Sequence, residues 1–234
     1  MQPVALPLTP PTTLELLRQW CEGRRADGHR LLGLSAPPGS GKTWLARQVP
    51  GVAPLSLDDL YWPQPRLGRG RRGLPGSHDL PRLMAVLDGF RRDGRVLAPR
   101  FDKTLAEGAG DRAGEQQLTG ELLLLEGWCL GAEGAGALAP YGPVWDRLDA
   151  LLVLLAPSPG RVLRWRLQAE ARQRRRGGAV LTAAEVAAML RAFAAAVPPE
   201  PCLERLQRAP RRPTWLLPLD GRRRPAGPLI CVRS

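Results

Sequence analysis

A turn of small residues between an apolar run and a helical segment constrains the fold of this chain more than any other feature. It reads Ala36-Pro-Pro-Gly-Ser-Gly-Lys-Thr43 and fits the P-loop pattern G-x-x-x-x-G-K-[ST], except that Ala36 stands at the first glycine. Residues 30–36 predict a buried strand before the turn, and residues 42–49 predict a helix after it. Small residues let successive backbone N–H groups curl around phosphate oxygens at the start of that helix. The turn therefore predicts an α/β fold with a nucleotide site.

The residues of this turn have separate expected roles. Lys42 would reach the β- and γ-phosphates of ATP as a catalytic residue, and Thr43 would hold Mg²⁺. The backbone that surrounds the phosphates would come from Gly39, Ser40 and Gly41. The alternative is a glycine-rich turn with an incidental lysine. We favour nucleotide binding, because the whole chain has two lysines and one of them falls here.

The remaining pattern predicts strands that alternate with helices. Helices are expected at 12–25, 79–92, 161–176 and 182–197, and strands at 53–57, 96–98, 122–125, 148–155, 214–219 and 229–232. Residues 61–77, 101–117 and 131–142 read as loops. This alternation predicts a three-layer α/β/α fold with a mostly parallel central sheet. We expect one domain over 1–234, with a helical extension at 1–29, a core at 30–234 and a helical, arginine-bearing lid near 157–180.

The composition bounds the class of protein. The 234 residues include 34 Lys and Arg against 22 Asp and Glu, a net charge of +12, and 34 − 2 = 32 of the basic residues are arginines. This bias is typical of a GC-rich genome, so the charge is weak support for a nucleic-acid partner. No apolar run reaches the ~18 residues of a membrane span, and residues 1–11 lack a signal-peptide pattern. Four scattered cysteines without a CxxC pair predict free thiols in the cytoplasm.

Acidic residues follow two of the predicted strands. Asp58 and Asp59 come just after the strand at 53–57, and Glu126 ends the apolar run at 122–125. Ligands bind beyond the carboxyl ends of strands in an open parallel sheet. One aspartate there can accept the proton of an attacking hydroxyl, and Glu126 can act on the metal, with water between them. The alternatives are acids that begin a turn or end a solvated strand.

Basic residues predict further contacts with the substrates. Three arginines of the helix at 161–176 are the lid candidates for binding ATP, since arginine stabilises charge on transferring phosphoryl oxygens: Arg161, Arg164 and Arg166. The run at 174–176 reads as a solvated basic face. Four residues lie where a substrate that carries a carboxylate would meet the P-loop: His78, Asp79, Arg100 and Lys103. A lone histidine is more often structural.

These motifs, in this order, resemble those of plant-type D-glycerate 3-kinase, a P-loop kinase family in the group of uridine kinase, phosphoribulokinase and pantothenate kinase. The resemblance runs from about residue 30 to 206 and rests on 33–43, 56–61, 75–80, 99–103, 110–112, 125–128 and 164–170. It implies ATP- and Mg²⁺-dependent phosphorylation of D-glycerate to 3-phosphoglycerate, in photorespiration or glycerate salvage. It also implies that Asp58 is the base, with Asp59 as second choice, and that Trp128 contacts the substrate. Leu60 replaces the usual Phe, and residues 61–73 are unusually rich in arginine.

Two other functions compete with this one. The acceptor could instead be a nucleoside, pantothenate or a sugar phosphate. The chain could also be a basic nucleic-acid-binding protein with a retained P-loop, which would need base-stacking aromatics beside its basic residues. We expect small-molecule partners, D-glycerate and ATP, with no nucleic acid and no membrane. The sequence leaves the oligomeric state open.

Overall fold

The described part of the computed structural model comprises residues 10–68, 72–134, 136–178 and 180–232. The first nine residues of the expected extension, on which most of the signal-peptide argument rests, lie outside it. So do residues 69–71 of the long loop and residue 135 of the glycine-rich loop. Among the described residues, no helix is both long enough and apolar enough to cross a bilayer. The expected cytoplasmic location stays a prediction.

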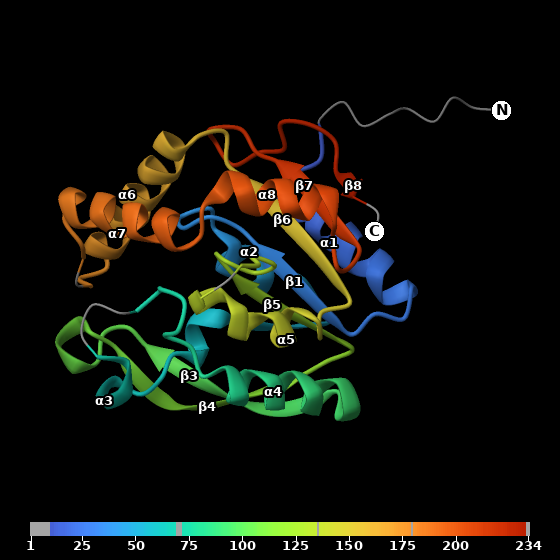
Figure 1. Ribbon diagram of the computed structural model, residues 1–234, viewed down its shortest axis with the longest axis horizontal. Helices are drawn as coiled ribbons and strands as arrows, with labels where there is room; N and C mark the ends of the chain where they lie inside the picture. The colour runs from blue at the N-terminus through green and yellow to red at the C-terminus, as the bar shows by residue number, and fades with distance from the viewer. Residues whose placement is uncertain (1–9, 69–71, 135, 179, 233–234) are drawn as a thin grey trace.

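A six-stranded sheet forms the centre of the described fold, in the order β2-β5-β1-β6-β7-β8 (Figure 1). Its strands are β1 (Leu31–Ser35), β2 (Val52–Ser56), β5 (Leu122–Gly127), β6 (Ala150–Leu155), β7 (Thr214–Pro218) and β8 (Ile230–Val232). The last pair, β7 with β8, is antiparallel, and the other neighbours in this sheet are parallel. The prediction of a mostly parallel sheet is therefore confirmed.

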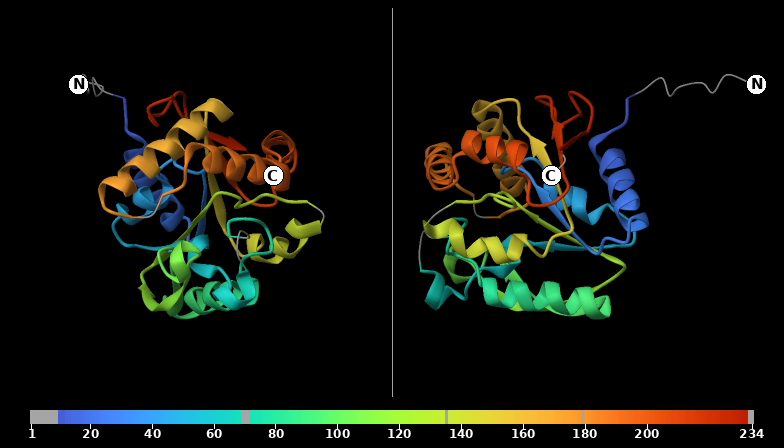
Figure 2. Two further views of the ribbon diagram at one scale, coloured as in Figure 1. Left: turned by 90° about the vertical axis from the view of Figure 1, so that its left-hand side faces the viewer. Right: turned by 45° about the vertical axis from the view of Figure 1, so that its right-hand side comes forward.

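Helices cover both faces of this sheet (Figure 2). Against one face pack α1 (Thr13–Ala26), α2 (Lys42–Arg47) and α6 (Pro159–Arg175), and against the other pack α4 (Leu80–Asp93) and α5 (Gly142–Trp145). The strands alternate between two cores, so that Leu122 and Leu124 face α1 and α2 while Leu123 and Leu125 face α4. A strand buried on both faces needs the continuous apolar run seen in the sequence.

Two further helices follow α6 along the chain. α7 (Ala183–Ala196) packs on α6, and α8 (Pro199–Arg208) lies near the end of β6, with Leu206 packed against the core that α4 also covers. The sequence predicts α7 but not α8, whose residues include none that is fully buried. Thr12 and Thr182 begin α1 and α7 with capping boxes to Glu15 and Glu185, as N-terminal signals of this kind require.

The segment after α4 differs from the expectation. The strand expected at 96–98 is present but longer, as β3 (Arg95–Asp102). The polar loop expected at 101–117 is wrong, because β4 (Asp111–Thr119) pairs with β3 in a separate antiparallel hairpin. Most β4 side chains are partly exposed, and only Leu118 is buried, so the strand lacks the apolar alternation that predicts one. The hairpin lies beside α4 at the bottom of Figure 1.

Short helical turns interrupt the predicted loops. In these loops lie α3 (Gln64–Leu67), η2 (Ala106–Gly108) and η3 (Gly136–Tyr141), and a further short turn, η1 (Leu57–Leu60), follows β2 just before the first loop. They differ from the expectation of plain loop because one to two turns are too short to show helical periodicity. Of these, η1 bears on function, since it carries both aspartates that follow β2.

Asp149 ties three elements together at the amino-terminal end of β1. One carboxylate oxygen, Oδ2, accepts hydrogen bonds from the backbone N–H groups of Arg30 and Leu31, both at 2.8 Å, and Oδ1 accepts one from Arg91 of α4 at 2.7 Å. Burial opposes ionisation, but these donors hold the pKa of Asp149 below its ordinary value. The ionised carboxylate is therefore the form that the folded state stabilises.

We predict that Asp149→Ala lowers the free energy of unfolding by about 1–3 kcal/mol at pH 7, because two backbone donors lose their acceptor. Since the folded pKa lies below the unfolded one, the contribution is present above the ordinary carboxyl range and disappears as the pH falls through the folded pKa. Urea unfolding at pH 7 and at pH 3 measures this difference. Asp93→Ala is the control, because Asp93 pairs with its neighbour Arg92 at the surface. Equal losses for the two variants would contradict the prediction.

Candidate active site

The turn between β1 and α2 has the backbone that a phosphate cradle requires. Gly39 and Gly41 have φ values of 79° and 93°, a conformation that side chains rarely tolerate. Ser40 is buried, and its hydroxyl has no hydrogen-bond partner among the described residues. Buried polar atoms are normally paired, so this hydroxyl fits a ligand oxygen that would lie in the turn.

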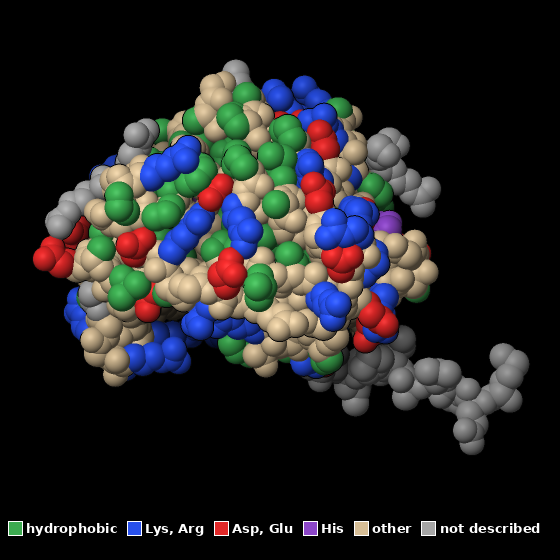
Figure 3. All heavy atoms as spheres, turned by 90° about the horizontal axis from the view of Figure 1, so that it is seen from below, with side chains coloured by type: hydrophobic (Ala, Val, Ile, Leu, Met, Phe, Trp, Pro, Cys, Tyr) green, Lys and Arg blue, Asp and Glu red, His purple; other side chains and the backbone are tan. Residues whose placement is uncertain are grey.

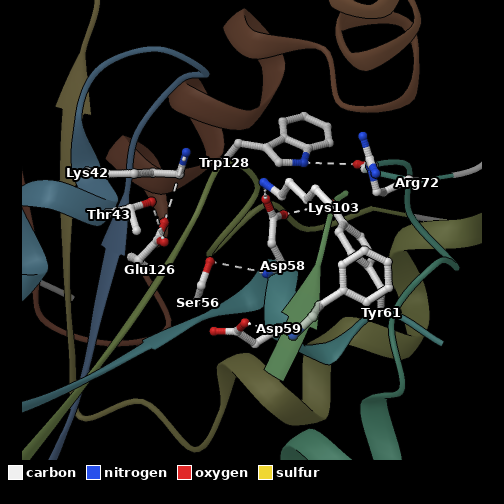
Figure 4. A network of polar contacts seen from close by, with 12 residues as sticks. Lys42, Thr43, Ser56, Asp58, Asp59, Tyr61, Arg72, Lys103, Glu126 and Trp128 are labelled. Carbon is white, nitrogen blue, oxygen red and sulfur yellow. Dashed lines mark hydrogen bonds and ion pairs between the residues drawn. The ribbon is translucent and has the colours of Figure 1, made fainter. Parts of the chain in front are cut away.

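Glu126 lies beside this turn because β5 pairs in parallel with β1, which places Leu34 opposite Glu126. The hydroxyl of Thr43 donates to Glu126 Oε1 at 2.7 Å, and Lys42 Nζ lies 4.0 Å from Oε2 (Figure 4). Oε2 is buried and has no hydrogen-bond partner among the described residues. One carboxylate and one hydroxyl fit Mg²⁺, which is usually held by one or two carboxylates and by substrate phosphates. Within the part of the chain that the structure describes, no cluster of three or more His, Cys, Asp and Glu side chains could hold a metal by itself.

Asp58 enters the site from η1, which begins where β2 ends. Its Oδ1 accepts a hydrogen bond from the hydroxyl of Tyr61 at 2.6 Å, and its Oδ2 lies 2.6 Å from Nζ of Lys103. Burial alone would raise the pKa of Asp58, but the positive charges of Lys103 and Lys42 and these two hydrogen bonds hold it well below its ordinary value. Asp58 is therefore an ionised carboxylate with a donor on each oxygen.

Asp59 points away from Lys103 (Figure 4). Its oxygens accept from the backbone N–H of Phe101 at 3.1 Å and from the side chain of Gln116 at 3.2 Å. Burial raises the pKa of Asp59 above its ordinary value. Asp59 thus joins η1 to the β3–β4 hairpin, and of the two aspartates only Asp58 lines the cavity described next.

A cavity of about 810 Å³ lies over the P-loop, between the hairpin and the helices α6 and α7. Gly39, Gly41, Lys42, Thr43 and Asp58 line its floor. Its lining includes seven cationic side chains: Lys42, Arg72, Lys103, Arg166, Arg172, Arg176 and Arg223. Two acids, Asp58 and Glu185, complete the charged groups of the lining among the described residues. This excess of positive charge suits a polyanionic ligand.

The arginines predicted for a lid divide into two groups. Arg166 lines the cavity and forms an ion pair with Glu170. Arg161 and Arg164 are exposed and do not line it, because helical spacing turns them toward other sides of α6, and Arg161 lies over Gly221. The lining arginines of this helix and its C-cap are instead Arg166, Arg172 and Arg176.

Three of the residues predicted to bind the acceptor lie elsewhere. His78 is buried, with Nδ1 2.6 Å from the hydroxyl of Tyr141, and burial lowers its pKa to about 4. Asp79 caps α4 and pairs with Arg112. Arg100 is exposed within β3. The contacts of His78 and Asp79 are thus structural, and none of the three residues lines the cavity. Lys103 and Trp128 do line it.

Aromatic stacking forms one wall of the cavity. Trp128 follows β5 and stacks on Phe193 of α7 with a centroid separation of 4.4 Å, and its indole N–H donates to the carbonyl of Gly73 at 2.9 Å. Gly73 has a φ of 93°, and a Cβ there would lie 2.5 Å from the ring of Phe193. The stack therefore joins β5, α7 and the loop before α4, and only glycine leaves room for it.

Sequence reasoning missed several residues of the site. Arg223, which has a φ of 67°, donates to the carbonyl of Gly39 at 2.9 Å and to Gln168 at 2.9 Å, so it joins the P-loop to α6. Arg72 donates to the carbonyls of Gly108 and Ala109 and lines the cavity. No motif marks either one among 32 arginines. Tyr61 had a signal in the sequence, since it ends the 56–61 segment that carries Asp58.

The parallel sheet, the P-loop and the carboxylates at the ends of β2 and β5 define a P-loop kinase. No family model matches the chain. It is 32% identical to the uncharacterized kinase mug58 of Schizosaccharomyces pombe, over 60% of this chain and 69% of that protein. It is 31% identical to the chloroplastic D-glycerate 3-kinase of Arabidopsis thaliana, over 71% of this chain and 49% of that protein. The chain thus spans about half the length of the plant relative.

The fold has solved counterparts. A D-glycerate 3-kinase from Cryptococcus neoformans superposes with a TM-score of 0.78 at 19% identity, over 93% of this chain and 99% of that one. At this identity the likeness concerns the fold alone. Together with the sequence matches, these findings confirm the resemblance expected from the motifs. The chain belongs to the P-loop kinase family that includes the fission-yeast kinase and the plant D-glycerate 3-kinase.

We predict that Gly73→Ala disrupts the aromatic wall. The left-handed backbone costs alanine about 1–2 kcal/mol, and forcing Phe193 away from Trp128 adds about 1–3 kcal/mol. Gly76→Ala is the matched control, because Gly76 has a φ of 89° and a Cβ there would have no neighbouring atom within 4 Å among the described residues. Thermal unfolding should show the larger loss for Gly73→Ala, together with weaker binding of a fluorescent ATP analogue. Identical losses at the two positions would show that the contact with Phe193 contributes nothing.

Proposed function

We propose that this kinase transfers the γ-phosphoryl group of ATP to the 3-hydroxyl of D-glycerate and yields 3-phosphoglycerate. The observation that carries the proposal is the position of Asp58, which shares one cavity with the P-loop and is paired there with Lys103. The similarity to the plant D-glycerate 3-kinase supports the choice of acceptor. The expected part in photorespiration or glycerate salvage stays a prediction.

ATP would lie along the P-loop side of the cavity. The backbone of Gly39, Ser40 and Gly41 would surround the phosphates, and Lys42 would neutralise charge on the β- and γ-oxygens. Arg166, with Arg172 and Arg176 farther along the same segment, would approach the phosphates from the lid. Thr43 and Glu126 would hold Mg²⁺, which when bound offsets the negative charge that develops on the phosphates.

D-Glycerate would occupy the side of the cavity near the hairpin. Its 3-hydroxyl would donate to Asp58, and its carboxylate would pair with Lys103, with Arg72 as the neighbouring cation of the lining. During transfer, the hydroxyl oxygen bonds to the γ-phosphorus and the bond from that phosphorus to the oxygen of ADP breaks. Asp58 takes the proton of the hydroxyl. Trp128 would border the acceptor, as the family resemblance implies.

We further propose that residues 30–234 form the kinase core and that the segment near 157–180 acts as its lid. The position of α6 is compatible with a lid, because α6 lies directly against the P-loop: a Cβ at Gly39 would lie 2.6 Å from backbone atoms of Trp165 and Arg166. Movement of this segment would therefore change the shape of the cavity beside the P-loop. Small-molecule substrates account for the positive lining without a nucleic-acid partner.

We predict that Asp58→Asn lowers kcat for D-glycerate by a factor of about 10²–10⁴, because the amide cannot accept the proton of the hydroxyl. Binding of an ATP analogue should stay within about twofold, since Asp58 lies off the P-loop. Asp59→Asn is the control: it keeps the size of the buried side chain, and Asp59 does not line the cavity. We expect it to affect stability more than kcat.

The test combines purified protein, ATP and Mg²⁺ with D-glycerate, glycerol, pantothenate, uridine and ribulose 5-phosphate, and follows ADP release and product identity. The proposal expects 3-phosphoglycerate as the main product. Turnover of a different acceptor, or 2-phosphoglycerate as product, would overturn the choice of the D-glycerate 3-hydroxyl. A larger loss of kcat for Asp59→Asn than for Asp58→Asn would reassign the base.

A further inference from the structure

We propose that Lys103 keeps Asp58 inactive until the carboxylate of the acceptor draws its ammonium group away. The pair thereby couples transfer to the presence of an acidic acceptor and suppresses transfer of the γ-phosphoryl group to water. The proposal rests on Asp58 as the base of the proposed function, but it does not depend on which acidic acceptor is used.

Both oxygens of Asp58 already have a hydrogen-bond donor. Tyr61 occupies Oδ1 and Lys103 occupies Oδ2, each at 2.6 Å, and Figure 4 shows the two donors converging on the carboxylate. Short contacts of this kind, one of them with an ionised donor, are among the stronger hydrogen bonds in proteins. A hydroxyl or a water must displace or share one of these donors before Asp58 can accept its proton.

Of the two donors, Lys103 is the one that can leave. The side chain of Lys103 is 51% exposed and follows the last residue of β3, and lysine carries its charge on a flexible four-carbon chain. Tyr61 is 2% exposed, stacks on His78 at 4.6 Å and meets Phe101 edge-on at 5.1 Å. Tyr61 is thus held in place by its neighbours, whereas Lys103 lines the cavity and can turn toward a ligand in it.

The charges around Asp58 make this release consequential. Three groups lower the pKa of Asp58: the cations Lys103 and Lys42 and the donor Tyr61. The charge of Asp58 in turn affects the pKa values of Asp59, His78 and Cys129. Burial favours the neutral form of Asp58, and the lysines oppose this effect. When Lys103 moves away, the ionised form of Asp58 loses the stabilisation of one cation. The carboxylate then becomes a stronger base.

The acceptor determines whether the release occurs. A carboxylate offers Lys103 a partner of the same charge as Asp58, so an acidic acceptor replaces one ion pair by another. A neutral polyol offers no such partner and leaves Lys103 on Asp58. Water lacks one as well, although in its case the balanced reaction is available: the water oxygen bonds to the γ-phosphorus, ADP leaves, and Asp58 would take the proton.

The experiment measures ATP hydrolysis without an acceptor. We expect Lys103→Met to raise the rate at least about tenfold over the unmodified protein, because general-base catalysis becomes available to water. Lys103→Arg keeps a positive charge beside Asp58, so it should raise the rate less than Lys103→Met does. Arg92→Met is the control and should leave the rate unchanged, because Arg92 pairs with Asp93 at the surface and does not line the cavity. The double variant Asp58→Asn/Lys103→Met should return to the low rate, which assigns the gain to Asp58.

Two further measurements separate this role from a structural one. In Lys103→Met, acceptor-independent hydrolysis should rise with pH through a higher apparent pKa than the acceptor-dependent reaction of the unmodified protein. Its KM for D-glycerate should increase, and its preference for D-glycerate over glycerol in kcat/KM should fall. Lys103→Gln serves as a second neutral variant, and a fluorescent ATP analogue verifies that each variant binds nucleotide.

The outcomes distinguish this inference from the proposed function. If Lys103→Met and Lys103→Gln bind the ATP analogue normally and hydrolyse ATP no faster than the unmodified protein, the inference is overturned, even if D-glycerate is the acceptor. If hydrolysis rises through Asp58 but the unmodified protein phosphorylates a different acid, the inference stands and the choice of D-glycerate fails. The inference would also be overturned if ATP hydrolysis stayed fast in Asp58→Asn/Lys103→Met, because the base that acts on water would then not be Asp58.

Discussion

Parallel pairing of β1, β5 and β2 is the constraint on which the site depends. β5 lies between β1 and β2, in a register that sets Glu126 opposite Leu34 on one side and Ser56 on the other. Because all three strands run in the same direction, their carboxyl ends meet at one edge of the sheet. The P-loop follows β1, Asp58 follows β2, and Glu126 lies near the end of β5. Three segments far apart in sequence thus deliver a phosphate cradle, a base candidate and a metal-ligand candidate to one place.

The walls around this edge come from elements outside the parallel core. The β3–β4 hairpin brings Lys103, and it is positioned by Asp59, which accepts hydrogen bonds from Phe101 and Gln116. On the other side, Arg223 joins the P-loop to α6, and the Trp128–Phe193 stack joins β5 to α7. The two adjacent aspartates therefore have different roles. Asp58 faces the cavity, and Asp59 positions the hairpin that carries Lys103, the partner of Asp58.

The basic residues of the chain lie in two kinds of place, the outer surface and the lining of the cavity. On the face that Figure 3 shows, basic side chains are interspersed with acidic ones and do not form a single continuous patch. Several arginines of the described residues form surface ion pairs, such as Arg82 with Glu115 and Arg147 with Asp88, and such pairs contribute little to stability. Among the described residues, by contrast, the cavity lining holds seven cations and two acids. The clustering of cations in the cavity, rather than the net charge of the chain, therefore indicates an anionic ligand.

Sequence patterns predict the parts of this structure in which local signals and burial agree. The strand at Leu122–Gly127 is apolar because both faces are covered, and the turn at residues 39–41 must be glycine-rich because of its positive φ values. The β4 strand escapes prediction because it is largely exposed, and α8 because it buries little. Among arginines, no periodic signal separates Arg166, which faces the cavity, from Arg164, which does not. Such distinctions depend on which way a helix face turns after packing.

The two lysines show how composition can still mark function. In a chain with 32 arginines, Lys42 and Lys103 both line the cavity. Arginine has a planar fork that binds a carboxylate in bidentate fashion, whereas lysine is a compact charge on a flexible stem. At residue 103, a fork would hold Asp58 firmly and exchange poorly between Asp58 and a ligand. At residue 42, the ammonium group lies 4.0 Å from Glu126 Oε2, and a P-loop lysine binds phosphate as a point charge. We therefore infer that both positions require a compact charge on a flexible stem, which arginine does not supply.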